Sequence, residues 1–190
     1  MPTRTFLALD LDEPIRRHLR RTQQELDAAG AVVRWTAADQ LHVTLKFLGD
    51  VADADLPGVC EMARQVAGAV EAFDFEVTGV TSAPPAGHMR MVWVDITDPT
   101  GRMADLNDAL EEAAAAMGFK RENRRFHPHL TLGRVKSAQR VPELRRAIAA
   151  VADTAYGSQG ADELVVYASQ LTDQGPVYAA LARVALAEPA

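Results

Sequence analysis

The sequence contains one tetrapeptide pattern twice: a histidine, then a threonine two residues later, then a leucine. The copies are His42-Val43-Thr44-Leu45 and His129-Leu130-Thr131-Leu132, which lie 87 residues apart in a chain of 190. Because the chain has only five histidines, its composition predicts roughly 0.03 such matches by chance. We therefore treat the repeat as a feature of the protein rather than a coincidence.

The spacing of the motif predicts a chemistry. Successive side chains of a β-strand point to opposite faces, so each histidine shares a face with its threonine, and the apolar pair takes the other face. An imidazole can act as general base or general acid near neutral pH, and a hydroxyl can donate a hydrogen bond to an anion. If the two copies face each other, the site fits a phosphate between two proton-transfer groups.

The histidines also have structural and metal-binding interpretations. A single histidine on a strand is more often structural, but the duplicated threonine partner favours function. His127 and His129 form a His-x-His pair, which is an alternative metal site. Pro128 separates them, however, and no cluster of carboxylates or cysteines lies nearby in the sequence, so we predict no metal. We predict that His18 is a solvated helix residue and that His88, after a Pro-Pro turn, lies outside the site.

Basic side chains gather before and just after the second motif. Residues 120–136 carry six basic side chains and one acidic side chain, whereas the whole chain has 20 basic and 26 acidic residues. A basic segment in an acidic protein favours a local anion site over general coating of nucleic acid. Arg134 directly continues the motif strand, while the alternative for Arg121 and Arg124 is a solvated loop.

Hydrophobic periodicity predicts strands alternating with helices in one compact unit of the α+β class. The predicted strands are 5–11, 33–36, 41–48, 73–80, 89–96, 129–135, 163–170 and 177–186. The predicted helices are 12–29, 54–69, 100–117 and 142–152. The alanines of 177–186 suit a helix equally well.

Composition excludes several classes of protein. The chain is 48% hydrophobic and 24% charged, which argues against disorder, and no apolar run approaches the roughly 18 residues of a membrane span. Asp10 interrupts the apolar stretch at the N-terminus, which argues against a signal peptide. A single cysteine, Cys60, excludes an internal disulfide and a multi-cysteine zinc site. We predict that Cys60 is a buried structural thiol and that the protein is cytoplasmic.

With their flanking residues, the two motifs resemble the two-histidine phosphoesterase superfamily, and within it the RNA 2′,3′-cyclic phosphodiesterases once named 2′-5′ RNA ligases. The matching blocks cover almost the whole chain and lie at 6–10, 33–35, 41–49, 91–94, 126–134 and 175–178. The resemblance implies one domain over residues 1–190, made of two intertwined, pseudo-symmetric lobes around a central cleft. Each lobe would be an antiparallel sheet with helices on its outer face.

The resemblance also implies a function. It predicts hydrolysis of RNA 2′,3′-cyclic phosphate ends to 2′-phosphomonoesters, without a metal or other cofactor and without an obligate protein partner. The implied binding partner is the 3′ end of an RNA or oligonucleotide that carries the cyclic phosphate. The resemblance also implies that His42 is the general acid. The implied site residues are the catalytic His42 and His129, the phosphate-binding Thr44 and Thr131, Arg134, and a base-stacking Phe47.

Phe47 and Arg134 conflict with strict alternation along a strand. Each lies five residues after its motif histidine, and an odd offset places a side chain on the opposite face. A bulge or twist before these residues, for example at Gly133, would return both to the cleft. Otherwise one of the two assignments is wrong.

Two other functions stay open at this stage. RNA end-joining is the reverse reaction through the same groups, and a non-catalytic RNA-end-binding protein would use the histidines only to hold phosphate. Linear 2′-5′ oligoadenylates and other cyclic phosphates are alternative substrates.

Overall fold

The computed structural model describes residues 2–172 and 175–189. Within them the strands are β1 (Thr3–Asp10), β2 (Val33–Trp35), β3 (His42–Val51), β4 (Phe73–Ala83), β5 (Met91–Thr97), β6 (His129–Val135), β7 (Ala155–Ala161), β8 (Glu163–Thr172) and β9 (Gly175–Ala185). The helices are α1 (Glu13–Asp27), α2 (Leu56–Ala67), α3 (Arg102–Ala116) and α4 (Val141–Ala150). The fold is therefore α+β, as predicted.

The strands form one antiparallel sheet in the order β7-β4-β5-β6-β3-β1-β8-β9, with β2 beside β6. In the described part of the chain, β3 and β6 pair only where Val43 faces Leu130. The sheet is consequently two halves that meet at the two motif strands. We call β1, β3, β8 and β9 with α2 and α3 the first lobe, and β2, β4, β5, β6 and β7 with α1 and α4 the second lobe.

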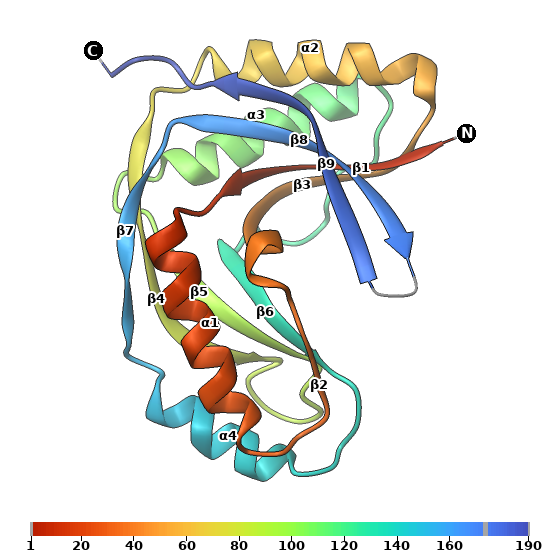
Figure 1. The fold of residues 1–190 in the computed structure, drawn as a ribbon. Helices are drawn as coiled ribbons and strands as arrows, with labels where there is room; N and C mark the ends of the chain where they lie inside the picture. The colour runs from red at the N-terminus through yellow and green to blue at the C-terminus, as the bar shows by residue number, and fades with distance from the viewer. Residues whose placement is uncertain (1, 173–174, 190) are drawn as a thin grey trace.

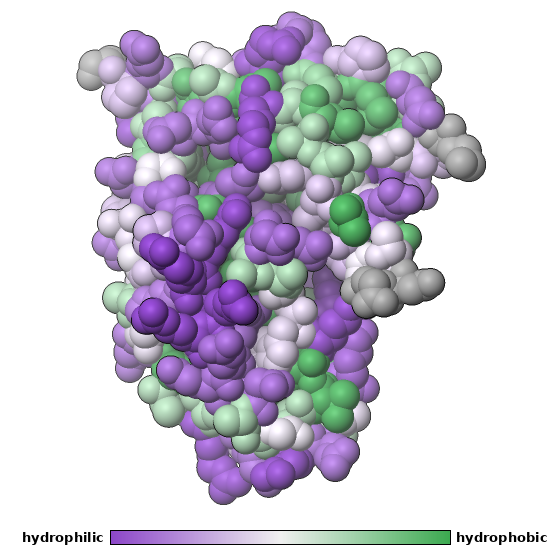
Figure 2. Space-filling view, viewed as in Figure 1, coloured by the Kyte–Doolittle hydropathy of each residue, from purple (hydrophilic) through white to green (hydrophobic). Residues whose placement is uncertain are grey.

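The helices exchange lobes along the chain (Figure 1). α1 follows β1 in sequence but packs near β7 and α4, and α3 follows β5 but packs against β3 and α2. The exposed face of α1 is strongly hydrophilic (Figure 2), whereas its buried face follows the helical repeat at Ile15, Leu19 and Leu26. The core side of each lobe is thus covered by a helix that follows a strand of the other lobe in sequence.

The apolar residues of both motifs lie in the core, as their alternation predicted. Val43, Leu45, Leu130 and Leu132 are all buried. Cys60 is half-buried in α2 and packs against the same core. Among the described residues, no helix combines the length and apolarity that crossing a membrane requires.

One element differs from the sequence-based expectation. β7 was not predicted, because its sequence includes Gly157 and Gly160 and lacks the β-branched residues typical of strands. It forms nevertheless as an edge strand paired with β4. The predicted strand 177–186, whose alanines suit a helix equally well, is confirmed as strand β9, which pairs with β8 from end to end.

Candidate active site

A cleft of about 360 Å³ runs between the two motif strands. The motif residues and their two companions all line it: His42, Thr44 and Phe47 from β3, and His129, Thr131 and Arg134 from β6. The structure therefore brings together the six residues that the sequence singled out. It also adds Arg4, Phe6, Arg34 and Tyr178, which the sequence analysis did not assign to the site.

β3 contains a bulge at the leucine that ends its histidine motif. The register with β1 shifts between Thr44 and Lys46, so Leu45 has no residue directly opposite. Leu45 and Lys46 are consecutive and both buried, after which Phe47 is 52% exposed. The extra residue reverses the alternation and returns Phe47 to the face of Thr44.

β6 contains the equivalent bulge. Its register with β5 shifts between Thr131 and Gly133, which leaves Leu132 without a residue directly opposite. Leu132 and Gly133 are both buried, and Arg134 is exposed on the cleft side. A Cβ on Gly133 would lie 2.7 Å from side-chain atoms of Trp35 and Val33, closer than real contacts allow. The conflict with strict alternation is thus resolved by a bulge in each strand, the second at the glycine suspected from the sequence.

A buried amide side chain holds each bulge from the core side. Asn107 of α3 donates a hydrogen bond of 2.8 Å to the Leu45 carbonyl, and Gln23 of α1 donates one of 3.0 Å to the Leu132 carbonyl. Both amides are only 6% exposed. The Leu132 carbonyl also accepts the backbone N–H of Thr36 at 2.8 Å, and Gln23 donates to the Thr36 carbonyl at 2.8 Å, so Gln23 ties the bulge to the chain that follows β2. Sequence reasoning missed both residues.

The two histidines share one hydrogen-bonding arrangement. Nδ1 of His42 lies 2.8 Å from the carbonyl oxygen of Gln40, and Nδ1 of His129 lies 2.7 Å from that of His127. A carbonyl oxygen only accepts, so Nδ1 carries the hydrogen in both rings. Each histidine therefore keeps Nε2 as the nitrogen available for proton transfer.

An aromatic ring on the neighbouring strand stacks on each imidazole. Phe6 of β1 stacks on His42 with centroids 4.9 Å apart, and Trp93 of β5 stacks on His129 at 3.9 Å. Tyr178 meets His42 edge-on at 5.3 Å. These rings fix the imidazole planes and remove water from one face of each.

Burial lowers the pKa of both His42 and His129 below 6.5, since desolvation disfavours the charged imidazolium. The carbonyl that accepts from each Nδ1 opposes this effect. Asp10 near His42 and Asp95 near His129 also raise the pKa by their negative charge. Burial thus favours the neutral imidazole in both rings, whereas a bound anion would favour their protonation.

Three arginines give the cleft a positive charge. Arg4, Arg34 and Arg134 line it, and none forms an ion pair within residues 2–172 and 175–189. Arg34 lies directly across from Arg134 in the β2–β6 pair. Like charges opposite each other on paired strands repel, and a bound anion would offset that repulsion. The arrangement therefore suits an anionic ligand. Arg4 and Phe6 are two residues apart on β1, so strand alternation places both side chains on the face that lines the cleft.

The remaining histidines lie outside the cleft. His127 is exposed and its Nε2 is 3.2 Å from Asp95, a carboxylate that the sequence analysis did not place beside it. No group of three or more metal-binding side chains occurs in the described ranges. His18 is exposed on α1 and meets Tyr156 edge-on, and His88 is exposed beside a different pocket.

Comparison with known proteins gives consistent matches. Residues 11–169 match the model of the 2′-5′ RNA ligase superfamily. The RNA 2′,3′-cyclic phosphodiesterase of Methanothermobacter thermautotrophicus is 35% identical over 94% of this chain and 96% of its own length. The protein of the same name from Escherichia coli is 33% identical over 98% of both chains. The crystal structure of Escherichia coli LigT complexed with 3′-AMP superposes with a TM-score of 0.79 at 28% identity, covering 98% of this chain and 99% of that one.

Proposed function

The chain belongs to the 2′-5′ RNA ligase superfamily, and we propose that it hydrolyses 2′,3′-cyclic phosphates at RNA 3′ ends. The observation that carries the proposal is the pair of His-Thr motifs lining one cleft, each with Nδ1 bound to the carbonyl two residues earlier. Relatives that cover nearly the whole chain are named RNA 2′,3′-cyclic phosphodiesterases. The structural relative LigT was crystallised with 3′-AMP, which supports a nucleotide in this cleft.

The proposed reaction needs one base and one acid. Nε2 of His129 removes a proton from water as the water oxygen attacks phosphorus. Nε2 of His42 gives a proton to the ribose 3′-oxygen as its bond to phosphorus breaks. The product is a 2′-phosphomonoester with a free 3′-hydroxyl, and the reaction uses no metal.

The surroundings of the histidines support this division of roles. His42 lies among Phe6, Tyr178 and the cleft face that carries Phe47, which is an aromatic surface suited to a base and ribose. The leaving oxygen belongs to that ribose, so the acid lies on the same side. The attacking water then enters from the side of His129, because entering and leaving oxygens lie in line across phosphorus.

Charge on the phosphate is balanced by three groups in this scheme. The hydroxyls of Thr44 and Thr131 donate to the non-bridging oxygens, and Arg134 neutralises the charge that grows on them. Arg4 and Arg34 also line the cleft and add positive charge beyond what one phosphate needs, which favours an RNA end over a free mononucleotide. A cytoplasmic location is part of the proposal, since the single half-buried Cys60 is typical of a reducing compartment.

Turnover of two substrates in EDTA tests the proposal. We expect 2′,3′-cyclic AMP and a short RNA with a cyclic 3′ end both to yield 2′-phosphates, with a higher kcat/KM for the RNA. Chromatography against authentic 2′- and 3′-nucleotides identifies the product. Saturable binding without product would instead indicate an RNA-end-binding protein. Activity lost in EDTA and restored by zinc would contradict the metal-free route.

A further inference from the structure

An aspartate lies directly opposite each motif histidine on the neighbouring strand. Asp10 of β1 pairs with His42 in the register of β1 and β3. Asp95 of β5 pairs with His129 in the register of β5 and β6. Nδ1 of each ring is already bonded to a backbone carbonyl, and Nε2 is the nitrogen that transfers protons in the proposed reaction. Each aspartate can therefore act on its histidine through its charge or through other side chains.

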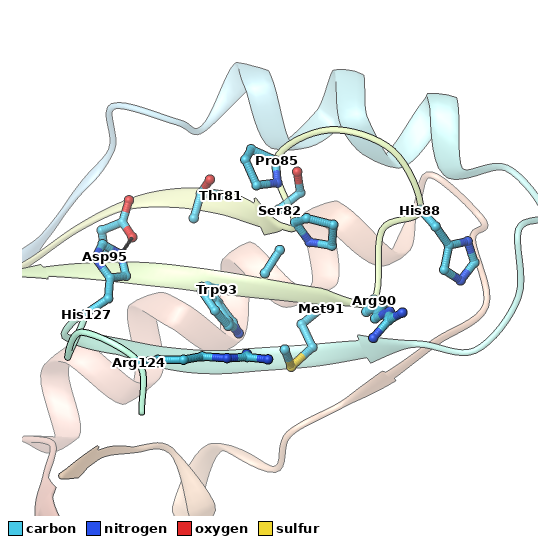
Figure 3. A pocket seen from close by; sticks show the side chains of 12 residues that line it. Thr81, Ser82, Pro85, His88, Arg90, Met91, Trp93, Asp95, Arg124 and His127 are labelled. Carbon is cyan, nitrogen blue, oxygen red and sulfur yellow. Dashed lines mark hydrogen bonds and ion pairs between the residues drawn. The ribbon is translucent and has the colours of Figure 1, made fainter. Parts of the chain in front are cut away.

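The Asp95 carboxylate is open to solvent. Its side chain is 41% exposed, and its Oδ1 lies 3.2 Å from Nε2 of His127, whose side chain is 62% exposed. Both residues lie at one end of a pocket on the second lobe, with Trp93 near the middle (Figure 3). Because water screens an exposed pair, this contact restrains the carboxylate only weakly.

The Asp10 carboxylate, in contrast, is held on both oxygens, and its side chain is 26% exposed. Tyr167 of β8 donates a hydrogen bond of 2.6 Å to Oδ1, and Arg183 of β9 donates one of 2.9 Å to Oδ2. Burial and the bond to Asp10 raise the pKa of Tyr167 to about 12, so its hydroxyl keeps the proton that it donates. Arg16 of α1 lies 3.9 Å from Oδ1, which ties the carboxylate to a helix of the second lobe. Asp10 is therefore fixed from three elements.

Tyr167 links Asp10 to the ring of His42. The hydroxyl of Tyr167 bonds Asp10, while its ring stacks on Phe6 with centroids 5.3 Å apart. Phe6 in turn stacks on His42 at 4.9 Å. The centroids of Tyr167 and His42 are 6.2 Å apart, so the tyrosine ring also borders the imidazole. A displacement of Asp10 would therefore disturb the aromatic wall against which His42 rests.

Asp10 also contributes negative charge to the surroundings of His42. The charged and titratable groups around that ring are Asp10 of β1, Arg16 of α1, Tyr167 of β8, Tyr178 of β9 and, lining the cleft, Arg4, Arg34, Arg134 and His129. Burial lowers the pKa of His42 most strongly, and the positive charge of Arg16 lowers it further. The Gln40 carbonyl and the negative charge of Asp10 raise this pKa. Asp10 therefore offsets part of the cost of protonating a buried imidazole.

We propose that Asp10 is a positioning residue for the reaction, which acts on His42 in two ways. Through Tyr167 and Phe6 it fixes the plane of the imidazole, and through its charge it stabilises the protonated ring that donates to the leaving oxygen. This rests on the proposed function, in which His42 is the general acid. An acid must hold its proton until the leaving oxygen takes it, and a fixed carboxylate opposite the ring meets that requirement.

Titration of the histidines by NMR measures the effect of the charge without any turnover. The signals of the five histidines are assigned with single-histidine variants of the full chain. We expect Asp10→Asn, which keeps the size of the side chain, to lower the midpoint of the His42 titration by about half a pH unit or more. Glu163→Gln is the matched control, because it removes a carboxylate that also pairs with Arg183, at 3.5 Å, and leaves Asp10 in place. An unchanged His42 midpoint in D10N, or an equal shift in E163Q, would overturn the proposal.

Kinetics of 2′,3′-cyclic AMP hydrolysis measure the effect on position. Tyr167→Phe keeps both the ring and the carboxylate and removes only the hydroxyl that joins them. We expect kcat to fall about threefold to tenfold while KM stays within about twofold, because the acid is misplaced and substrate contacts remain. Tyr156→Phe is the matched control, since it removes the hydroxyl of a buried tyrosine that does not line the cleft. A kcat of Y167F equal to that of the wild type or of Y156F would overturn the positioning role.

The two measurements separate this inference from the proposed function. If the wild type fails to hydrolyse cyclic AMP, the proposed function fails, and the titration of D10N still decides whether Asp10 acts on His42. If the wild type is active and D10N titrates like the wild type, the inference about Asp10 fails and the proposed function stands.

Discussion

Gln23 and Asn107 hold equivalent positions in opposite lobes: each is a buried helix amide that donates to the carbonyl of the bulged leucine in a motif strand. The residue two positions after each bulged leucine is then exposed in the cleft, Phe47 in one lobe and Arg134 in the other. The pseudo-symmetry of the site thus extends from the motifs to the side chains that hold their strands in shape.

Replacing Gln23 by leucine should damage the Arg134 side of the site. The variant loses the hydrogen bonds of Gln23 to the carbonyls of Leu132 and Thr36, which costs about 1–3 kcal/mol of unfolding free energy. We expect kcat to fall about 10- to 100-fold through misplacement of Arg134, whereas Asn107→Leu should mainly raise KM through Phe47. Gln24→Leu, on the exposed face of the same helix, is the control. Equal kcat in Q23L and Q24L would show that the amide does not position the site.

Phe47→Ala should raise KM without lowering stability. The ring is 52% exposed in the cleft, so little buried area is lost, while base stacking is worth about 1–3 kcal/mol. Val32→Ala is a matched control, since Val32 is 46% exposed and does not line the cleft. Steady-state kinetics and thermal unfolding separate the two effects. An unchanged KM for every nucleotide would remove Phe47 from substrate binding.

The pH dependence should be bell-shaped with an optimum on the acid side of neutrality. Catalysis requires a neutral base and a protonated acid, and burial lowers the pKa of both His42 and His129 below 6.5. The kcat/KM profile of the free enzyme should therefore peak below pH 6.5. The cyclic phosphate is an anion that favours imidazolium, so the kcat profile should be displaced to higher pH. A kcat/KM maximum above pH 7 would contradict the assignment of both limbs to these histidines.

The bulge in β3 also creates a buried ion pair. Lys46 is 1% exposed, and its Nζ lies 2.8 Å from Glu111 Oε2 and 2.8 Å from the Lys120 carbonyl. Lys46→Ala leaves the Glu111 carboxylate without its cation and should cost about 3–5 kcal/mol in urea unfolding. Removing both charges in K46M/E111L should recover much of that loss.

An exposed ion pair provides the comparison. Arg64 and Glu61 pair on the surface of α2, where both side chains are more than half exposed. Arg64→Ala should change the unfolding free energy by less than about 1 kcal/mol, because water screens the pair. A Lys46→Ala effect as small as this would show that the buried pair does not stabilise the protein.

The sequence predicted most of the site because the site follows local rules. Alternation placed the motif histidines and threonines on one face, and the duplication indicated two lobes. The bulges could be suspected but not located in β3, because a bulge depends on the register with a neighbouring strand. Gln23 and Asn107 were missed for a related reason, since their acceptors lie 109 and 62 residues away.

Several features outside the motifs could not be predicted from local sequence patterns. β7 forms from a glycine-rich segment because β4 offers it a complete partner, a tertiary contact that propensity does not contain. Asp95 meets His127 across 32 residues, and Arg34 faces Arg134 only because β2 pairs with β6. Each of these contacts joins strands or loops that are distant in sequence.

Hydrolysis of 2′,3′-cyclic AMP by histidine variants tests the central claim most directly. His42→Ala and His129→Ala should each lower turnover about 10²- to 10⁴-fold while circular dichroism stays native, because each removes a proton-transfer group. The double variant should be little worse than either single variant, since both groups act on one transition state. His18→Ala, an exposed histidine on α1, should keep full activity. Near-wild-type turnover in either H42A or H129A would contradict the two-histidine mechanism.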